Sequence, residues 1–383
     1  MTYNTYIGFE HLKKLSTASS ICFDCETTGL KPKTGGLRLL QFGSTARKTI
    51  VVVDLFEATE QDLAELDLFF RNGDRFWLAH NAVFDLGWCQ EYGWFPQGEV
   101  RCSMIASKLL ENGKLNIRHS LAAVAKRHLN IELDKQEQRS DWSADLTESQ
   151  IRYAAKDVEV LCELDGIIHQ KIAQAALSGA YSLECRALSA MASMQLTGLP
   201  FDEATLQQVC EDYETDVKNL GREVHLELDA ALPAQHKLPR EKDGSFNLRP
   251  RDIGRVRDQT KQYAGFNIAS PKQLLEKITI VLGEVPIDPK TRGTTNEKPS
   301  ASRTALQEYR GNHTVIATYL DWKRAEKRRQ MVESLLKHQS RDRFVRASYW
   351  QLGAETGRMT CSEPNCQQIP RDEQFREAVI APE

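Results

Sequence analysis

The sequence predicts an α/β domain built on a mixed sheet, followed by a mainly α-helical region. Up to about residue 175, short runs rich in β-branched and aromatic residues alternate with helix-like segments, a pattern typical of an α/β domain. Beyond a break near Ala176–Gly179, strand signals nearly vanish and long polar helices dominate. A chain of 383 residues has room for about two domains. We expect them to span residues 1–175 and 176–383.

The first part begins with three runs close enough to form a three-strand meander: Ser20–Asp24, Leu37–Gly43 and Thr49–Asp54. A fourth strand is expected at Phe76–His80. Apolar residues at helical spacing predict four helices: Asp62–Phe70, Ala82–Tyr92, Cys102–Glu111 and His119–Leu129. A long helix is expected to begin near Thr147, because Thr147 and Gln150 have capping-box spacing ahead of an apolar-periodic run.

The second part reads as long helices separated by Pro- and Gly-containing loops near residues 231–254 and 285–300. The expected helices are Leu183–Leu196, Glu203–Leu228, Pro271–Ile278 and Val315–His338. Towards the end, Phe344–Leu352 is predicted to be a strand, and a turn-rich stretch follows it to Pro370.

The composition excludes several classes of protein. It is 41% hydrophobic and 27% charged, which is ordinary for a globular chain. No apolar run approaches the ~18 residues of a membrane helix, and Met1–Glu10 lacks the layout of a signal peptide. We therefore expect a cytoplasmic protein with no membrane partner. The nine cysteines argue against a disulfide framework, since their number is odd and they are scattered. Cys22 and Cys25 would point to opposite faces of a strand, which excludes a shared metal.

The net charge of −3 does not indicate a nucleic-acid-binding protein, but the charge is unevenly distributed. Residues 321–346 contain nine Lys or Arg against four acids, a local excess of five positive charges. Such a stretch can meet phosphates. The alternative is a solvated helix face.

Acidic residues lie at the ends of three predicted elements. Asp24 and Glu26 end the first strand, so they project from one face and can hold one metal ion between them. Asp85 follows the strand Phe76–His80, four residues after Asn81. The alternative there is a helix cap followed by a solvated acid.

The third element is the long helix, where Tyr153 and Asp157 are four residues apart and share a face. The alternative is an amphipathic helix with an exposed aspartate. A D-x-E pattern recurs at Asp157-Val158-Glu159, so the pattern alone is not specific.

Taken in order, Asp24 to Leu30, Asn81 to Asp85 and Tyr153 to Asp157 resemble the DEDD exonuclease superfamily in its tyrosine-bearing subclass. The resemblance covers residues 15–175. It implies a ribonuclease H-like fold and a 3′–5′ exonuclease that trims single-stranded ends, foremost of DNA. The implied catalytic residues are Asp24, Glu26, Asp85, Tyr153 and Asp157.

The chemistry of phosphodiester hydrolysis fits these residue types. Two Mg²⁺ or Mn²⁺ ions roughly 3.5–4 Å apart can activate water and stabilise the leaving oxygen. Such ions want oxygen ligands, so the implied metal ligands are Asp24, Glu26, Asp85 and Asp157. Tyr153, with an ordinary pKa of about 10, is expected to hold the attacking water by a hydrogen bond.

The same resemblance implies contacts with the substrate. Leu30 and Phe84 correspond to apolar contacts to the terminal nucleotides, where stacking tolerates any base. Asn81 and Thr27 are further candidate contacts. Core packing and helix capping are the alternatives for these four residues.

Beyond the break, three segments resemble family A DNA polymerases: Glu184–Asp202, Phe266–Leu274 and Thr356–Arg371. Within the last, Cys366 and Gln368 stand where the family usually has Leu and Asn. The resemblance implies a thumb at residues 320–346, Arg358 as a substrate contact, and primer–template DNA as a partner.

The sequence stops before the family's palm carboxylate motifs. We therefore expect a truncated polymerase region without polymerase activity of its own, with a separate polymerase half or other replication proteins as candidate partners.

Two other functions stay open. The first is a ribonuclease D-like enzyme that trims RNA, against which the Thr356-Gly357-Arg358 and Pro364–Pro370 segments argue. The second is a non-catalytic DNA-binding fragment, against which the complete set of acidic residues argues.

Overall fold

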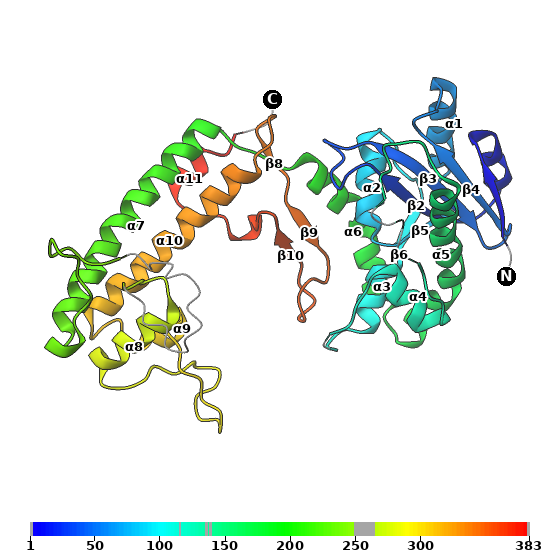
Figure 1. Ribbon diagram of the computed structural model, residues 1–383. Helices are drawn as coiled ribbons and strands as arrows, with labels where there is room; N and C mark the ends of the chain where they lie inside the picture. Colours follow the sequence, from blue (N-terminus) through cyan, green and yellow to red (C-terminus); the bar gives the residue numbers. More distant parts are fainter. Residues whose placement is uncertain (1–2, 115, 135–136, 138–139, 249–264, 381–383) are drawn as a thin grey trace. The chain divides into compact units, whose positions relative to one another are not determined.

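The computed structural model describes residues 3–114, 116–134, 137, 140–248 and 265–380 (Figure 1). Contacts between residues divide the chain into two compact units. The first contains residues 1–199 together with 344–367, and the second contains residues 200–343 together with 368–383. The predicted division near residue 175 coincides with the turn between two helices inside the first unit.

A six-stranded mixed sheet forms the centre of the first unit, in the order β1-β4-β3-β2-β5-β6. Strands β2, β3 and β4 form the antiparallel meander that the sequence predicts, whereas β1, β5 and β6 join in parallel. The expected mixed sheet is therefore confirmed. The strands are β1 Asn4–Ile7, β2 Ser20–Thr27, β3 Leu37–Ser44, β4 Thr49–Asp54, β5 Phe76–Ala79 and β6 Glu99–Cys102.

Helices surround this sheet. The longest, α5, begins with the predicted capping box between Thr147 and Gln150. The helices of the unit are η1 Phe9–Leu15, α1 Glu60–Phe70, α2 Ala82–Glu91, α3 Ser103–Leu110, α4 Leu121–Leu129, α5 Glu148–Gln174 and α6 Ser178–Thr197.

Helix α5 lies close against one face of the sheet. Leu39 and Val52 of the sheet pack there with Ala154 of the helix. A Cβ atom at Gly43 would lie 2.5 Å from Val158 Cγ1 and 2.8 Å from Cys162 Sγ, so only glycine allows this approach. The alternate residues of the strands face the other way, towards α1 and α2. This close packing determines the distance between α5 and the strands β2 and β3.

A segment from far along the sequence completes the first unit. Residues 344–367 carry β9 (Ser348–Trp350) and β10 (Thr360–Ser362), which pair antiparallel. Lys108 Nζ donates to the Gln351 carbonyl at 2.8 Å, and Gln195 Nε2 donates to the Tyr349 carbonyl at 3.1 Å. The single strand predicted at Phe344–Leu352 is interrupted between Val345 and Ser348, where the Arg346 side chain donates to the Leu196 carbonyl.

The second unit is mainly helical, as the sequence predicts. Its core joins α7, α8 and α10 around Val224, Ile278 and Trp322. The elements are α7 Glu203–Ala231, η3 Ala234–His236, α8 Pro271–Leu282, α9 Arg303–Leu306, η4 Gln307–Tyr309, α10 Thr314–His338 and α11 Glu373–Glu377. Short elements at the unit boundaries are β7 Leu199–Pro200, β8 Phe344–Val345 and η5 Cys366–Gln368.

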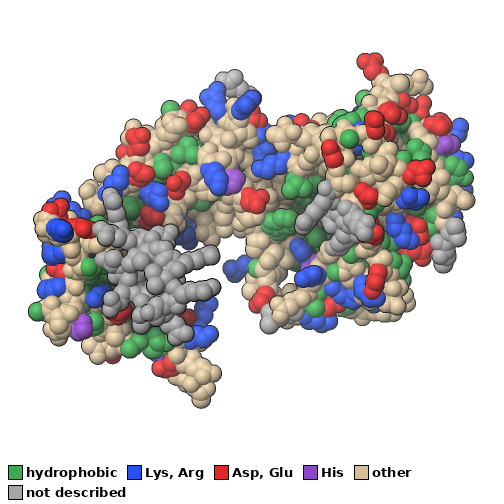
Figure 2. Space-filling view, in the orientation of Figure 1, with side chains coloured by type: hydrophobic (Ala, Val, Ile, Leu, Met, Phe, Trp, Pro, Cys, Tyr) green, Lys and Arg blue, Asp and Glu red, His purple; other side chains and the backbone are tan. Residues whose placement is uncertain are grey.

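Charged side chains on the helical unit are interspersed rather than segregated, on the face that Figure 2 shows. In α10, Arg329 lies 2.9 Å from Glu326 and 3.2 Å from Glu333, and Arg328 lies 2.7 Å from Asp372. Part of the basic stretch is therefore neutralised within the unit itself. No helix in the described part of the chain has both the length and the apolar character of a membrane span.

Candidate active site

The carboxylates of Asp24, Glu26 and Asp157 lie together where β2 meets α5. Asp24 and Glu26 alternate with buried residues on β2, so both face the helix. One carboxylate oxygen from each of the three residues lies within 4.8 Å of the others. The cluster therefore joins two motifs that are about 130 residues apart in the sequence.

Asp85, the fourth acid, lies in the first turn of α2 and is only 1% exposed. It is not part of the group of three, but its charge acts on both Asp24 and Glu26. Neither of its carboxylate oxygens has a conventional hydrogen-bond partner among the described residues; the weakly donating thiol of Cys25 lies beside it. The alternative of a solvated acid is therefore wrong.

Burial raises the pKa values of three of these acids, and neighbouring negative charges add to the effect for Asp24 and Glu26. Burial is the largest cause for Asp24, followed by the charges of Asp85, Glu26 and Asp157, and its pKa lies well above the ordinary range. Burial and the neighbouring aspartates raise the pKa of Glu26 to about 8, and burial raises the pKa of Asp85 to about 7. Without a cation, the cluster therefore resists full ionisation at neutral pH.

The donor set fits a hard divalent cation. It offers only carboxylate oxygens, the ligands that Mg²⁺ and Mn²⁺ prefer. The buried carboxylate of Asp85 is a second indication, because neither of its oxygens accepts a well-formed hydrogen bond within the described residues, whereas buried acceptors normally do.

Tyr153 lies one helical turn before Asp157, near enough for the charge of that carboxylate to act on its hydroxyl. Its ring packs on Trp142 at 6.4 Å between centroids. Burial, then the charges of Asp157 and Glu26, raise the pKa of the phenol far above its ordinary value. The hydroxyl therefore stays protonated and can donate a hydrogen bond, but it cannot act as a base at neutral pH.

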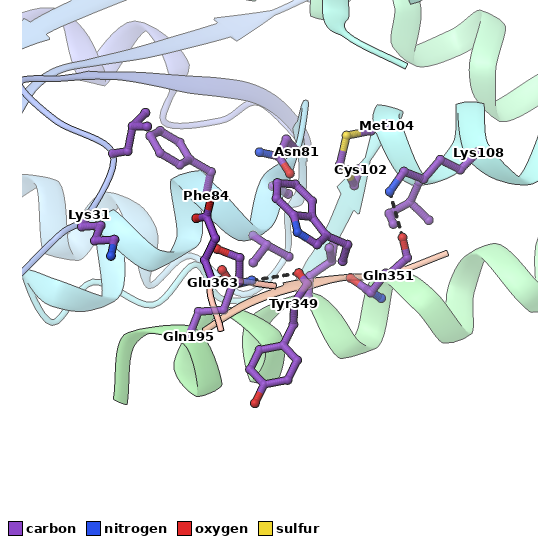
Figure 3. A pocket seen from close by; sticks show the side chains of 17 residues that line it. Lys31, Asn81, Phe84, Cys102, Met104, Lys108, Gln195, Tyr349, Gln351 and Glu363 are labelled. Carbon is purple, nitrogen blue, oxygen red and sulfur yellow. Dashed lines mark hydrogen bonds between the residues drawn. The ribbon is translucent and has the colours of Figure 1, made fainter. Parts of the chain in front are cut away.

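Leu30, Asn81 and Phe84 share a cavity of about 430 Å³ in the first unit. In Figure 3, Asn81 and Phe84 lie on the α2 side of the cavity, and Tyr349 and Gln351 come from the segment 344–367. Leu30 is 84% exposed, so core packing does not explain it. Asn81 is at the first position before α2 but makes no side-chain cap; its backbone is left-handed, with φ of 63°.

The other two predicted substrate contacts are elsewhere. Thr27 does not line the cavity; its hydroxyl donates to the Gly29 carbonyl at 2.6 Å and so fixes the turn after β2. Arg358 is exposed and also lies outside the cavity lining.

Local patterns in the sequence do not identify the cavity residues Lys108, Tyr349 and Trp350. Tyr349 and Trp350 reach the cavity through the folding back of residues 344–367, which no local pattern reveals, and the same segment meets Lys108 of α3 there.

Two family models match parts of the chain. Residues 9–173 match the family described as 3'-5' exonuclease, and residues 248–383 match DNA polymerase family A. DNA polymerase I of Aquifex aeolicus is 28% identical, and the match covers 97% of this chain and 58% of that protein. DNA polymerase I of Chloroflexus aurantiacus is 23% identical, over 96% of this chain and 37% of that protein. The chain thus spans less than two thirds of either relative.

Among solved structures, the polymerase domain of Pol1 from M. smegmatis, in complex with DNA primer-template and dNTP, shares the fold. Its TM-score is 0.70 at 19% identity, covering 96% of this chain and 56% of that one. This similarity extends over both units of the chain.

Proposed function

We propose, because this chain belongs to the family A DNA polymerases and carries a 3′–5′ exonuclease domain, that it removes nucleotides from the 3′ ends of DNA in a proofreading role. The observation that carries the proposal is the cluster of Asp24, Glu26 and Asp157, with oxygens within 4.8 Å of one another. Three carboxylates held this close, beside a fourth that is buried, suit a site that gathers positive charge.

We propose two divalent ions, Mg²⁺ or Mn²⁺, as the cofactors. Asp24, Glu26 and Asp157 would hold them, with Asp85 as the fourth ligand or as a buried negative charge behind the site. When bound, such ions supply a nucleophilic water at neutral pH and stabilise charge on the leaving 3′ oxygen. The raised pKa values of the cluster support this proposal, since a bound cation restores the ionised forms.

The chain's own residues then orient the reactants. Tyr153 would donate its hydroxyl hydrogen to the attacking water, because the phenol keeps its proton at neutral pH. Glu26 would accept a hydrogen bond from the same water. Asp157 contributes a ligand, and its negative charge helps to keep the phenol of Tyr153 protonated.

Leu30 and Phe84 would contact the terminal bases of a single strand. An exposed leucine and an aromatic ring on one cavity are typical of sites that stack bases without reading sequence. Asn81 lines the same cavity and would form a hydrogen bond with the terminal nucleotide. Thr27 acts through the shape of its turn, and Arg358 would meet primer–template DNA. The related Pol1 structure contains such DNA, which supports this choice of partner.

Digestion of 5′-labelled oligonucleotides tests the proposal. DNA and RNA of one sequence are incubated with the full chain and Mg²⁺, Mn²⁺ or EDTA, with paired and mispaired 3′ ends compared. We expect a metal-dependent DNA ladder that shortens from the 3′ end and runs faster from a mispair. A preference for RNA would favour a ribonuclease D-like function instead, and no product with either metal would refute the proposal.

A further inference from the structure

Gln41 is a fully buried glutamine in the middle of β3. Neither the oxygen nor the nitrogen of its side-chain amide has a hydrogen-bond partner within the described ranges. Folding removes the water that such a group would otherwise bind, so a buried amide without partners is unfavourable. A core strand would be more stable with an apolar residue of the same size at this position.

The register of the sheet places Gln41 directly opposite Asp24. The two residues are paired across the antiparallel strands β2 and β3, so their side chains share the face that α5 covers. On the other side, Gln41 is paired with Val52 of β4. Along β3, the neighbours on this face are Leu39 and Gly43. Among these four neighbours, only Asp24 is polar.

We infer that Gln41 is a positioning residue for Asp24. When the Asp24 carboxylate is ionised and holds a divalent cation, it accepts a hydrogen bond from the Gln41 amide. The inference rests on the proposed function. An ionised carboxylate has about four acceptor positions, and a cation occupies only part of them. The last torsion of a glutamine side chain is soft, so the amide can turn towards its neighbour.

An amide suits this place better than a lysine or an arginine would. It can fix the orientation of Asp24 without neutralising the charge that attracts the cation. Outer hydrogen-bond partners of metal ligands typically contribute about 10–100-fold to metal affinity. The effect of Gln41 should therefore appear in metal binding itself, apart from any effect on cleavage.

Two substitutions in the full chain separate this role from packing. Gln41→Met keeps the length and removes the amide. Ser44→Ala is the matched control, because it removes another buried, partnerless polar group from β3 on the face turned away from Asp24. Mn²⁺ affinity is measured by isothermal titration, and the melting temperature is measured in EDTA.

We expect Gln41→Met to bind Mn²⁺ about tenfold more weakly, with a melting temperature in EDTA equal to or above that of the parent. Ser44→Ala should keep the parent's affinity. Gln41→Asn, which keeps the amide on a shorter stem, should bind Mn²⁺ more tightly than Gln41→Met.

An affinity of Gln41→Met within twofold of the parent's would overturn the inference while leaving the proposed function intact. Equal weakening in Ser44→Ala would also overturn it, since the effect would then be one of strand packing. A parent chain that binds no Mn²⁺ would refute the proposed function, and the role of Gln41 with it.

Discussion

The acidic cluster of the first unit and the basic helix α10 of the second differ in how their charges are arranged: like charges lie together in the cluster, whereas opposite charges are paired in α10. Asp24, Glu26 and Asp157 are held together, and burial, followed by the neighbouring negative charges, raises the pKa values of Asp24 and Glu26. In α10, by contrast, Arg329 is held by glutamates one turn away on either side. Charge that is paired inside the protein stabilises the protein. Like charges that are gathered at one place instead favour the binding of a cation from outside.

The largest effect is expected from removing one carboxylate of the acidic cluster. Asp157→Asn should reduce exonuclease activity by roughly 10³-fold or more, beyond the 10²–10³ typical for one hydrogen-bond donor, because a metal ligand is lost. Glu159→Gln is the matched control on the same helix, where the carboxylate only pairs with Lys156 at the surface. Single-turnover rates on a labelled DNA strand measure both. Comparable losses in the two variants would contradict the special role of the cluster.

Tyr153→Phe sharpens the distinction between holding the cation and orienting the water. We expect cleavage to slow by about 10–10³-fold, while Mn²⁺ affinity stays near that of the parent. The phenol donates a hydrogen bond, whereas the carboxylates carry the charge. If Mn²⁺ affinity fell in step with the rate, the tyrosine would be acting through the metal site.

Gly43→Ala tests whether the acidic cluster depends on tertiary packing. The added methyl group would displace α5 and with it Asp157, so we expect a loss of about 1–3 kcal/mol in the free energy of unfolding and slower cleavage. Gly166→Ala, on α5 itself with nothing near the added atom, should instead stabilise by roughly 0.5–1 kcal/mol. Denaturant unfolding measures both. A neutral Gly43→Ala would show that the helix can shift freely.

The pH dependence of stability in EDTA should reveal the unpaired acids. Glu26 has a folded pKa of about 8 and Asp85 of about 7, both above the ordinary values near 4. Between these unfolded and folded pKa values, the folded state therefore binds more protons than the unfolded state. The free energy of unfolding consequently falls as the pH rises from about 4 to about 8. His80, whose pKa burial lowers to about 4, has the opposite effect below pH ~6.5. The cleanest test is thus between pH 7 and 8.

In that range, the melting temperature should fall in EDTA and fall less in Mn²⁺. Glu26→Gln should flatten the dependence, because its amide does not titrate. A melting temperature that rises with pH in EDTA would contradict the pKa directions.

The smallest expected effect tests the paired charges of α10. Lys327 is exposed, and if it meets a phosphate its removal should lower the log–log salt slope of duplex binding by about 0.7–0.9. Arg329→Ala should change the slope less, because that guanidinium is already held by Glu326 and Glu333. Fluorescence anisotropy against salt concentration measures both. Equal changes would mean that internal pairing does not keep Arg329 from DNA.

Much of the site follows from local patterns in the sequence. Alternation along a strand suffices to place Asp24 and Glu26 on one face, and helical spacing suffices for Tyr153 and Asp157. The burial of Asp85 does not follow, because it depends on where α2 packs. The position of Gln41 opposite Asp24 does not follow either, because it depends on the strand register, although a glutamine inside the apolar run of β3 is a visible irregularity.

There is also a physical reason why two strands of the sheet, β1 and β6, could not be predicted from the sequence. β1 and β6 are the two edge strands, each four residues long and mostly exposed or half-buried, so neither has a hydrophobic period. Tertiary pairing alone defines them. The return of residues 344–367 is equally invisible, since each of its hydrogen bonds to α3 and α6 spans at least 150 positions.

The first unit is built from two separate segments of the chain, which has a consequence for its synthesis on the ribosome. Its sheet and helices emerge early, but the segment 344–367, which binds Lys108 and Gln195, follows only after residues 200–343 of the helical unit have been made. At about 5–20 residues per second, the nascent unit waits for several seconds to half a minute with this surface of α3 and α6 uncovered. During that interval, the wall of the cavity that Tyr349 and Gln351 later form is open, so a chaperone or a neighbouring nascent chain can reach it.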